Sequence, residues 1–503
     1  MFLRRIQVPD FRVLKNVDLT FEPEFSPRIF PLGSLNGGGK STLLQLIFIL
    51  LSCSSDPEKD VFIQNMLEGF EIEKGENQKL LTTIHLSQGN QDIKLQFICH
   101  QNEIPIKKIT TDEKHEELFE NKIKFSLLGI DRELEQEISK LETEIANLEA
   151  KYNKLSQILE IKDSEERHKV IEKELNAIKY GDLGSFFREV LKINKNNKNI
   201  ETNLHELNVV IENLVNTAQE KQQSVQLKII ELERSKIILD KISDYLKEQN
   251  FHHICNYGGA SDHDTKYALL CNSEQLNPNE ANDLLKQLAN KIFLAAPFTQ
   301  VFIFISRSNS KLLFKGGNNK YTYYAKLEDT KRKLPNLFTY DLLSVDYIVS
   351  SFKEARDKDF KQAIESQGEY GDAYKNLLNE FNSLLGNKKI NLDTDLSGVN
   401  FKIETNGETR ELYPEDLSHG ELKRLSIYVW LKYKQIEDSI VLMDEIENAF
   451  HPDWQYQIIS DLAEWGASNQ YILATHSYEL CQALTPAHVK ELEPKLLRPE
   501  VEN

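Results

Sequence analysis

Long apolar runs are absent from this chain, and their absence argues against a membrane-spanning protein. Its 503 residues are 40% hydrophobic and 28% charged, whereas a transmembrane helix needs about 20 consecutive apolar residues. The start of the chain, Met1-Phe2-Leu3-Arg4-Arg5, moves into alternating residues and lacks the long apolar core of a signal peptide. We therefore expect a cytoplasmic protein with no membrane partner, large enough for about two or three domains.

Cysteine is also scarce, and disulfide bonds are not expected in that compartment. The chain has five scattered cysteines: Cys53, Cys99, Cys255, Cys271 and Cys481. Two of them lie near His252, His253 and His263 in the sequence. Because these spacings fit no regular zinc module, packed polar residues and a zinc site remain as alternatives.

Basic residues are outnumbered, since the net charge is -18. This balance disfavours indiscriminate binding of nucleic acid. Residues 307–333 are nevertheless rich in lysine and arginine, ending in Lys331, Arg332 and Lys333. They predict either a solvated β-hairpin or a contact with a phosphate backbone.

Hydrophobic patterns divide the chain into an α/β N-terminal lobe (1–130), a helical insertion (131–249) and a C-terminal lobe (250–503). Strands at 3–8, 17–21 and 28–32 precede an apolar helix at 41–51, as in a βαβ unit. Further expected elements are strands at 80–86 and 93–99 that pair through Gly89-Asn90, a strand at 301–305, helical structure over 340–385, and strands at 401–404 and 410–413 that pair through Asn406-Gly407.

The insertion carries two apolar stripes at helical spacing. The first repeats every four and three residues from Leu134 to Leu159, and the second runs from Leu204 to Leu246. Gly181 and Gly184 lie in the break between them, which contains no Cys-x-x-Cys pair for a zinc hook. This pattern predicts an antiparallel coiled-coil hairpin about 70 Å long; the alternative is two long helices packed on a globular body.

A glycine-rich turn follows the strand at 28–32. Backbone N–H groups at a helix N-terminus bind phosphate, and lysine and a hydroxyl complete such a site for ATP and Mg²⁺. We expect Lys40 to reach the β- and γ-phosphates and Ser41 to bind Mg²⁺. Ser34 stands where the usual pattern has glycine, so the loop entry is expected to differ; a turn that only caps a buried helix is the alternative. The cofactor-binding run is Asn36, Gly37, Gly38, Gly39, Lys40, Ser41 and Thr42.

Two carboxylates follow the apolar run 439–443. We expect Asp444 to hold Mg²⁺ and Glu445 to orient and polarise the attacking water, although a surface acidic pair is the alternative. His476 follows a second apolar run, 471–474. It is expected to donate a hydrogen bond to the γ-phosphate.

Ser418 and Gly420 belong to the run Leu417-Ser418-His419-Gly420-Glu421, which precedes an apolar helix. Ser418 can cap this helix. Alternatively, the helix N-terminus offers its dipole and hydroxyl to a γ-phosphate held by a second protomer. Combined with the other three motifs, this pattern favours an ATP-hydrolysing site shared between two copies of the chain.

The order of these motifs resembles that of ABC-type ATPases. The opening 8–16 is similar to the SMC, RecF and DNA-repair branch, and 444–452 to the OLD-like ATPases of bacterial defence. The resemblance implies an α/β head built from N- and C-terminal segments around the inserted coiled-coil hairpin. It also implies that Arg12 lies near the nucleotide phosphates and that a glutamine lines the metal, for which Gln300 is a candidate.

OLD nucleases carry a Toprim domain after the ATPase, and we expect none here because Asn503 closely follows His476. A free-standing ATPase of this kind resembles PtuA of Septu and retron-associated anti-phage systems. That resemblance implies an oligomeric regulatory ATPase that controls a separate HNH-type nuclease, with DNA or a retron nucleic acid as a further candidate partner. The alternative is a RecF/SMC-like repair ATPase that binds DNA directly. The coiled-coil insertion argues against a transporter ATPase.

Overall fold

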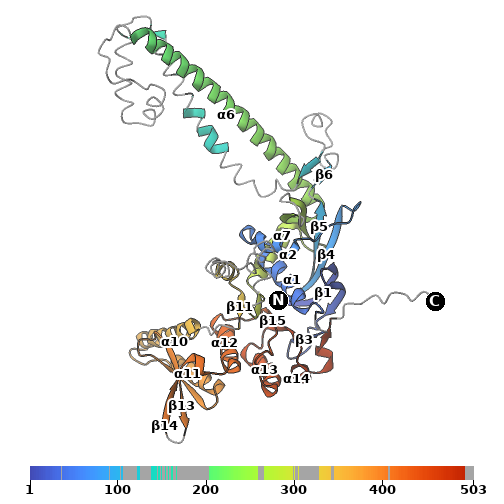
Figure 1. Cartoon of the computed structure of the whole chain (residues 1–503), viewed down its shortest axis with the longest axis vertical. Coiled ribbons are helices and arrows are strands. Elements are labelled where there is room, and N and C mark those ends of the chain that lie inside the picture. Colours follow the sequence, from blue (N-terminus) through green and yellow to red (C-terminus); the bar gives the residue numbers. More distant parts are fainter. Residues whose placement is uncertain are drawn as a thin grey trace, which may run out of the picture. The chain divides into compact units, whose positions relative to one another are not determined.

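The computed structural model divides the chain into two compact units, residues 1–104 with 246–503, and residues 105–245. Figure 1 traces the chain and labels its elements. The structure describes residues 1–34, 37–89, 91–101, 103–105, 122–124, 138–143, 203–258, 265–297, 300, 304, 328–340, 345–405 and 408–492, with further positions between 145 and 166. The first unit therefore joins both ends of the chain.

An antiparallel sheet occupies one part of the first unit, in the strand order β2-β1-β4-β5-β9-β8. The predicted pairing of the strands around Gly89 is confirmed, because Gln88 of β4 pairs with Gln91 of β5. The strands are β1 (Phe2–Phe11), β2 (Leu14–Thr20), β4 (Gln78–Gln88), β5 (Gln91–Gln101), β8 (Phe251–Gly258) and β9 (Thr265–Ser273).

A parallel sheet forms the centre of the same unit, in the order β11-β10-β15-β16-β3-β17. Its strands are β3 (Ile29–Gly33), β10 (Ile292–Ala296), β11 (Leu337–Thr339), β15 (Ile440–Asp444), β16 (Gln470–Ala474) and β17 (Lys490–Glu491). Strand β3 comes from the N-terminal segment and pairs with β16 and β17 from the C-terminal segment. The predicted α/β head built from both chain ends is thus observed.

The parallel sheet is buried on both faces, because successive side chains of a strand point to opposite sides. Ile440 and Leu442 of β15 pack in the core that includes α1 (Lys40–Cys53), α2 (Asp60–Leu67), α7 (Pro278–Ala289) and the antiparallel sheet. Val441 and Met443 pack in the opposite core, with α12 (His419–Tyr433) and α13 (Pro452–Trp465). The sheet is thus the middle layer of the unit.

Smaller elements complete the first unit. The expected helical stretch over 340–385 is two helices, α10 (Val345–Glu365) and α11 (Ala373–Leu384). Asp359 of α10 accepts hydrogen bonds from the N–H groups of Ala373 and Tyr374, which begin α11. The remaining elements are β12 (Lys388–Leu392), β13 (Val399–Thr405), β14 (Glu408–Leu412), α14 (Tyr478–Gln482) and the short 3-10 turns Pro57–Lys59, Pro414–Asp416 and Pro486–His488.

Two expected strand positions have different outcomes. The pair around Asn406-Gly407 is confirmed, since Thr405 of β13 pairs with Glu408 of β14. The strand expected at 301–305 is wrong where it can be compared, because Phe304 lies in a 3-10 turn and the other positions lie outside the described residues. The strand of this region is β10, immediately upstream.

The second unit contains the long helix α6 (Asn203–Glu248), which continues into the first unit and is drawn in green in Figure 1. Val225 and Leu239 of the predicted stripe are buried, and so is Ile242, which the stripe omitted. Of the first predicted helix, residues 138–143 are helical, and Gln222 Nε2 of α6 donates to Glu149 Oε1 at 3.1 Å. The remainder of that arm lies mostly outside the described residues. A short two-stranded ladder pairs β6 (Glu103–Pro105) with β7 (Lys122–Lys124).

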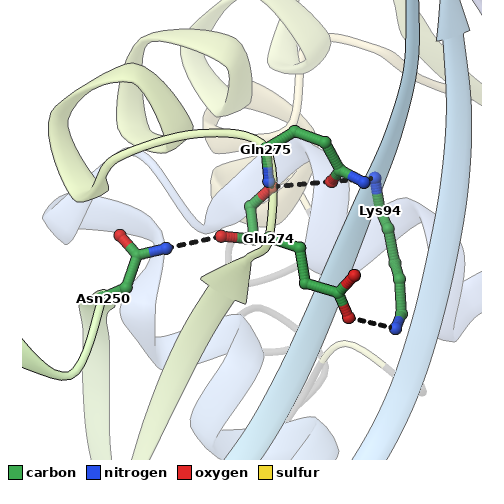
Figure 2. Close-up of polar contacts among 5 residues, drawn as sticks. Lys94, Asn250, Glu274 and Gln275 are labelled. Carbon is green, nitrogen blue, oxygen red and sulfur yellow. Dashed lines mark hydrogen bonds and ion pairs between the residues drawn. The ribbon is translucent and has the colours of Figure 1, made fainter.

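The C-terminal end of α6 is fastened to the antiparallel sheet within the first unit (Figure 2). Asn250, with a φ of 57°, donates from its Nδ2 to the carbonyl oxygen of Ser273. The same Nδ2 also donates to the carbonyl oxygen of Leu276 at 3.2 Å. Lys94 of β5 reaches the same turn from the other side, through an ion pair with Glu274 at 2.6 Å and a hydrogen bond from its backbone N–H to Gln275 Oε1 at 3.2 Å. These contacts fix the point at which the chain returns from the insertion.

None of the five cysteines is paired, and all but Cys481 are buried. Within the part of the chain that the structure covers, we find no helix with the length and hydrophobicity of a membrane span.

Candidate functional site

Three neighbouring strands of the parallel sheet end at one edge and carry the predicted motifs there. Strand β3 leads into the glycine turn, β15 ends at Asp444, and β16 leads to His476. The carboxyl ends of parallel strands meet at the same edge of a sheet, where α/β proteins bind ligands. Segments more than 400 residues apart in the sequence, such as Ser41 and Asp444, therefore meet there.

The glycine turn has the conformation that only glycine adopts readily. Gly37 has a φ of 80° and Gly39 a φ of 91°. A Cβ at Gly39 would lie 2.6 Å from Leu14 Cδ2 and 2.9 Å from Val13 Cγ2, so the β1–β2 turn closes on the loop. Gly38 completes the turn, Thr42 lies in the first turn of α1, and Asn36 lies outside the described residues.

Lys40 turns back over this loop. Its Nζ donates to the backbone oxygen and the Oγ of Ser34, both at 3.1 Å, and lies 3.4 Å from Nδ1 of His476. Burial lowers the pKa of Lys40, against the raising effect of Glu447, Asp444 and Glu445. Ser34, the residue that departs from the usual glycine pattern, thus supplies two acceptors for the lysine.

Ser41 and Asp444 form the contact expected of a magnesium site. The Ser41 hydroxyl donates to Asp444 Oδ1 at 3.0 Å, and Asp444 is only 3% exposed. Burial raises the pKa of Asp444 to about 6, and Glu445 and Glu447 also raise it, whereas the hydrogen bond from Ser41 and the charge of Lys40 lower it. Hydroxyl and carboxylate oxygens are ligands that Mg²⁺ prefers, so these residues fit the ion.

Glu445 follows Asp444 in a left-handed conformation, with a φ of 51°. Its N–H donates to the carbonyl oxygen of Ala474 at 2.9 Å, which ties this turn to the end of β16. Its half-buried side chain accepts a hydrogen bond from Asn448 Nδ2 at 2.7 Å. The turn therefore places the carboxylate beside, and not within, the buried strand.

Glu447 is a buried carboxylate that the sequence analysis gave no role. Its Oε1 accepts the backbone N–H of His476 at 2.6 Å. Its Oε2 is buried with no hydrogen-bond partner among the residues that the structure describes. Its position in the 444–452 run, three residues after Asp444, is the sequence signal that could have identified it. This contact holds the backbone of the exposed His476 against the acidic turn.

Ser418 caps α12, as the first interpretation predicted. Its Oγ accepts the N–H of Glu421 at 3.3 Å, and Glu421 Oε2 accepts the N–H of Ser418 at 2.8 Å. Burial would raise the pKa of Glu421, but hydrogen bonds from Lys388 and Ser418 hold it below its usual range. Ser418 is exposed, so capping leaves the interpretation as a site for a second protomer open.

Gly420 has a local structural reason to be glycine. A Cβ at this position would lie 2.8 Å from the carbonyl oxygen of Ala449 and 3.2 Å from the Trp454 ring. The start of α12 therefore packs directly on the turn that follows Glu445.

Arg12 and Gln300 each contact an element next to the site. Arg12 Nη2 donates to the carbonyl oxygen of Met66 at 2.7 Å, next to the Val13-Leu14 contact with Gly39. Gln300 Oε1 accepts from Nε2 of Gln45, a buried residue one turn beyond Ser41 on α1. The predicted roles of Arg12 at the phosphates and Gln300 at the metal remain predictions.

The other candidate sites receive little support. Within the described residues no group of three His, Cys, Asp or Glu side chains could hold a metal ion, and His263 lies outside them. Burial lowers the pKa of His252 and of His253 to about 4. In the basic stretch, 328–333 is helical instead of a β-hairpin, and Arg332 and Lys333 both pair with Asp329. Residues 307–327 lie outside the described part.

Comparison with known proteins gives one family match. Residues 295–482 match the family model described as "AAA domain, putative AbiEii toxin, Type IV TA system". This part contains Ser418, Asp444 and His476, but not the glycine turn of the N-terminal segment. No curated protein matches the chain.

Solved structures of Smc head domains also match. The Pyrococcus furiosus head with an extended coiled coil, bound to the C-terminal domain of ScpA, is 10% identical, with 96% of this chain and 91% of that chain covered and a TM-score of 0.29. The Pyrococcus yayanosii head with a coiled coil and joint is 12% identical, with 96% of this chain and 94% of that chain covered and a TM-score of 0.30. An Smc head bound to the C-winged helix domain of ScpA is 9% identical, with 96% of this chain and 92% of that chain covered and a TM-score of 0.34. What the family match adds is that the segment from β10 to α14 is similar to AAA-type ATPase domains.

Proposed function

We propose that this chain binds ATP with Mg²⁺ and hydrolyses it to ADP and phosphate at the carboxyl edge of the parallel sheet. The observation that carries the proposal is the hydrogen bond between Ser41 and Asp444, 3.0 Å long, at the N-terminus of the helix that follows the glycine turn. It unites a phosphate-binding turn and a buried carboxylate, the two parts that a metal-nucleotide site needs.

Each residue has a definite role in this proposal. Lys40 and the N–H groups of the glycine turn hold the phosphates, and Ser41 and Asp444 hold the metal ion. When bound, Mg²⁺ neutralises phosphate charge and polarises the phosphoryl oxygens. Glu445 orients the attacking water, and His476, next to Lys40, donates a hydrogen bond to the γ-phosphate.

A second copy of the chain completes the site in our proposal. Ser418 is exposed at the N-terminus of α12, where hydroxyl and helix dipole both favour an anion. Lys40 and Asp444, in contrast, are buried at 6% and 3% exposure. An exposed anion-binding end is suited to the nucleotide of a facing protomer.

The finer proposal is that the chain is a cytoplasmic regulatory ATPase of an anti-phage system that controls a separate HNH-type nuclease. It rests on the resemblance of the 444–452 run to OLD-like ATPases and of the chain's organisation to PtuA of Septu systems. The direct-binding alternative gains no support from the described part of the basic stretch, where Asp329 neutralises Arg332 and Lys333. We expect an HNH protein encoded beside this chain to co-purify with it, and expect the chain alone to leave DNA intact. DNA cleavage by the purified chain would contradict the proposal.

Replacement of Glu445 by Gln tests the hydrolytic site. Gln keeps the shape of the side chain but removes the charge that polarises water, so ATP binding is retained and turnover falls by a factor of about 100 or more. The ATP-bound assembly is then expected to persist in size-exclusion chromatography. Lys40→Ala is expected to abolish ATP binding, and Lys286→Ala, an exposed lysine paired with Asp283, serves as the control.

Turnover of Glu445→Gln at the parental rate would remove Glu445 from the proposed chemistry. Binding of ATP by Lys40→Ala as tight as by Lys286→Ala would refute the phosphate site itself.

A further inference from the structure

Lys423 is a buried lysine of α12 that the proposed chemistry does not use. It lies five residues beyond the cap Ser418 and is 5% exposed. Its Nζ donates to the carbonyl oxygen of Glu445 at 2.9 Å and to that of Asn448 at 3.1 Å. A lysine from the capped helix thus binds the backbone of the turn that carries the water-orienting carboxylate.

This turn needs external support. Glu445 and Ala449 both have left-handed backbones, with φ values of 51° and 70°, which residues with a side chain adopt only where their surroundings impose it. The Asn448 N–H closes the turn on the carbonyl oxygen of Glu445 at 3.2 Å. Lys423 binds that same oxygen, so its ammonium ion lies at the centre of the turn.

The rest of the surroundings keep Lys423 in place. Its Nζ lies 4.0 Å from the centre of the Tyr340 ring and 5.5 Å from that of Phe450. Tyr340 is itself fixed, because its hydroxyl donates to the carbonyl oxygen of Ala295 on β10 at 3.1 Å. Ring faces and carbonyl oxygens both stabilise a cation in a buried place.

A second contact joins the same two elements. Gly420 precedes Lys423 by three residues, which places both on one face of α12. The Cα of Gly420 approaches Ala449 so closely that a Cβ there would lie 2.8 Å from its carbonyl oxygen. One face of the helix therefore contacts both ends of the turn, through Lys423 at Glu445 and through Gly420 at Ala449.

We propose that Lys423 is a positioning residue for Glu445. Through Lys423, helix α12 couples its anion-binding N-terminus at Ser418 to the Glu445 carboxylate of the same protomer. The ammonium ion holds the Glu445 carbonyl and thereby fixes the direction of the Glu445 side chain. This inference rests on the proposed function for its catalytic consequence, but the mechanical coupling itself can be tested without ATP.

Lys423→Met, which keeps the length of the side chain and removes the charge, tests the proposal. In the nucleotide-free protein we expect amide exchange of a peptide covering 445–450 to accelerate by a factor of about 10 or more. With ATP we expect kcat to fall by a factor of about 10 to 100 with KM changed less than about twofold, because orientation is lost and binding is kept. The matched control is Arg424→Met on the same helix as Lys423, which breaks the partly buried ion pair with Asp461 of α13.

Arg424→Met is expected to lower Tm and to leave both the exchange of 445–450 and kcat within about twofold of the parent. A purely structural role for Lys423 predicts the same behaviour for both variants, and that result overturns the proposal. Unchanged exchange of the turn in Lys423→Met also overturns it, whether or not the parent hydrolyses ATP. A parent without ATPase activity refutes the proposed function and leaves the exchange result to decide the coupling. Should Lys423→Met not fold, Lys423→Gln takes its place with the same two outcomes.

Discussion

Asp444 is a buried carboxylate whose ionisation opposes the stability of the folded chain. It is 3% exposed, lies at the end of a fully buried strand and has Glu445 and Glu447 nearby. Burial, reinforced by these neighbours, raises its pKa to about 6. An aspartate in such surroundings is ionised reluctantly, and a bound cation would reverse that preference.

The pH dependence of stability follows from this shift. Because the folded-state pKa lies above the unfolded value near 4, the folded protein binds more protons between about pH 4 and 6, and its stability falls as the pH rises through that range. Asp444→Asn removes this penalty and keeps an acceptor for Ser41. We expect it to stabilise the nucleotide- and metal-free protein at pH 7.5 by about 1 to 3 kcal/mol in urea unfolding, and not at pH 4.

The control for Asp444→Asn is Asp283→Asn, an exposed position on α7 whose carboxylate pairs with Lys286. It is expected to change stability by less than about 0.5 kcal/mol. If Asp444→Asn were less stable than the parent at pH 7.5, the ionised carboxylate would be stabilised by neighbouring groups, and the predicted penalty would be wrong.

Among the elements, those marked by a functional motif, a turn signal or a long helical pattern could be predicted, whereas a short buried strand without such a marker could not. Strands β3, β15 and β16 are short apolar runs that end at glycine, acidic or histidine motifs, and each motif fixed which run was the strand. Strand β10 has no such marker, and the run 292–296 competes with 301–305, which has similar composition. Periodicity alone does not separate two short apolar runs, and the strand expected at 301–305 fails at Phe304.

Residue roles follow the same division. The contacts of Ser41, Asp444, Lys40 and His476 could be anticipated, because each residue type has a known task beside a phosphate. Lys423 and Glu447 act on backbone groups of the turn after Asp444 and of His476. Tertiary packing decides which carbonyl or amide group a buried charge contacts, and no sequence pattern indicates that partner.

For the molecule as a whole, the position of β3 decides how the chain is organised. This strand lies between β16 and β17, so the parallel sheet is incomplete without the N-terminal segment. Gln470 adds a second tie, because its side chain exchanges hydrogen bonds with both backbone groups of Leu3, at 2.7 and 2.8 Å. The 105–245 unit, in contrast, is a separate compact body.

The first unit is therefore expected to fold without the second. Strand pairing places Gln101 of β5 opposite Tyr267 and Phe251 of β8 opposite Asn272, both on β9. The gap to be bridged is thus on the order of 20 Å, which a flexible linker of about 12 residues spans. We expect a chain with 105–245 replaced by such a Gly/Ser linker to unfold cooperatively and to bind ATP as the parent does, measured by calorimetry. The matched control is the fragment 246–503, which keeps most strands of the parallel sheet but lacks β3 and α1, and should show no cooperative transition. If that fragment folded alone, or the linked protein did not, the two chain ends would not form one folding unit.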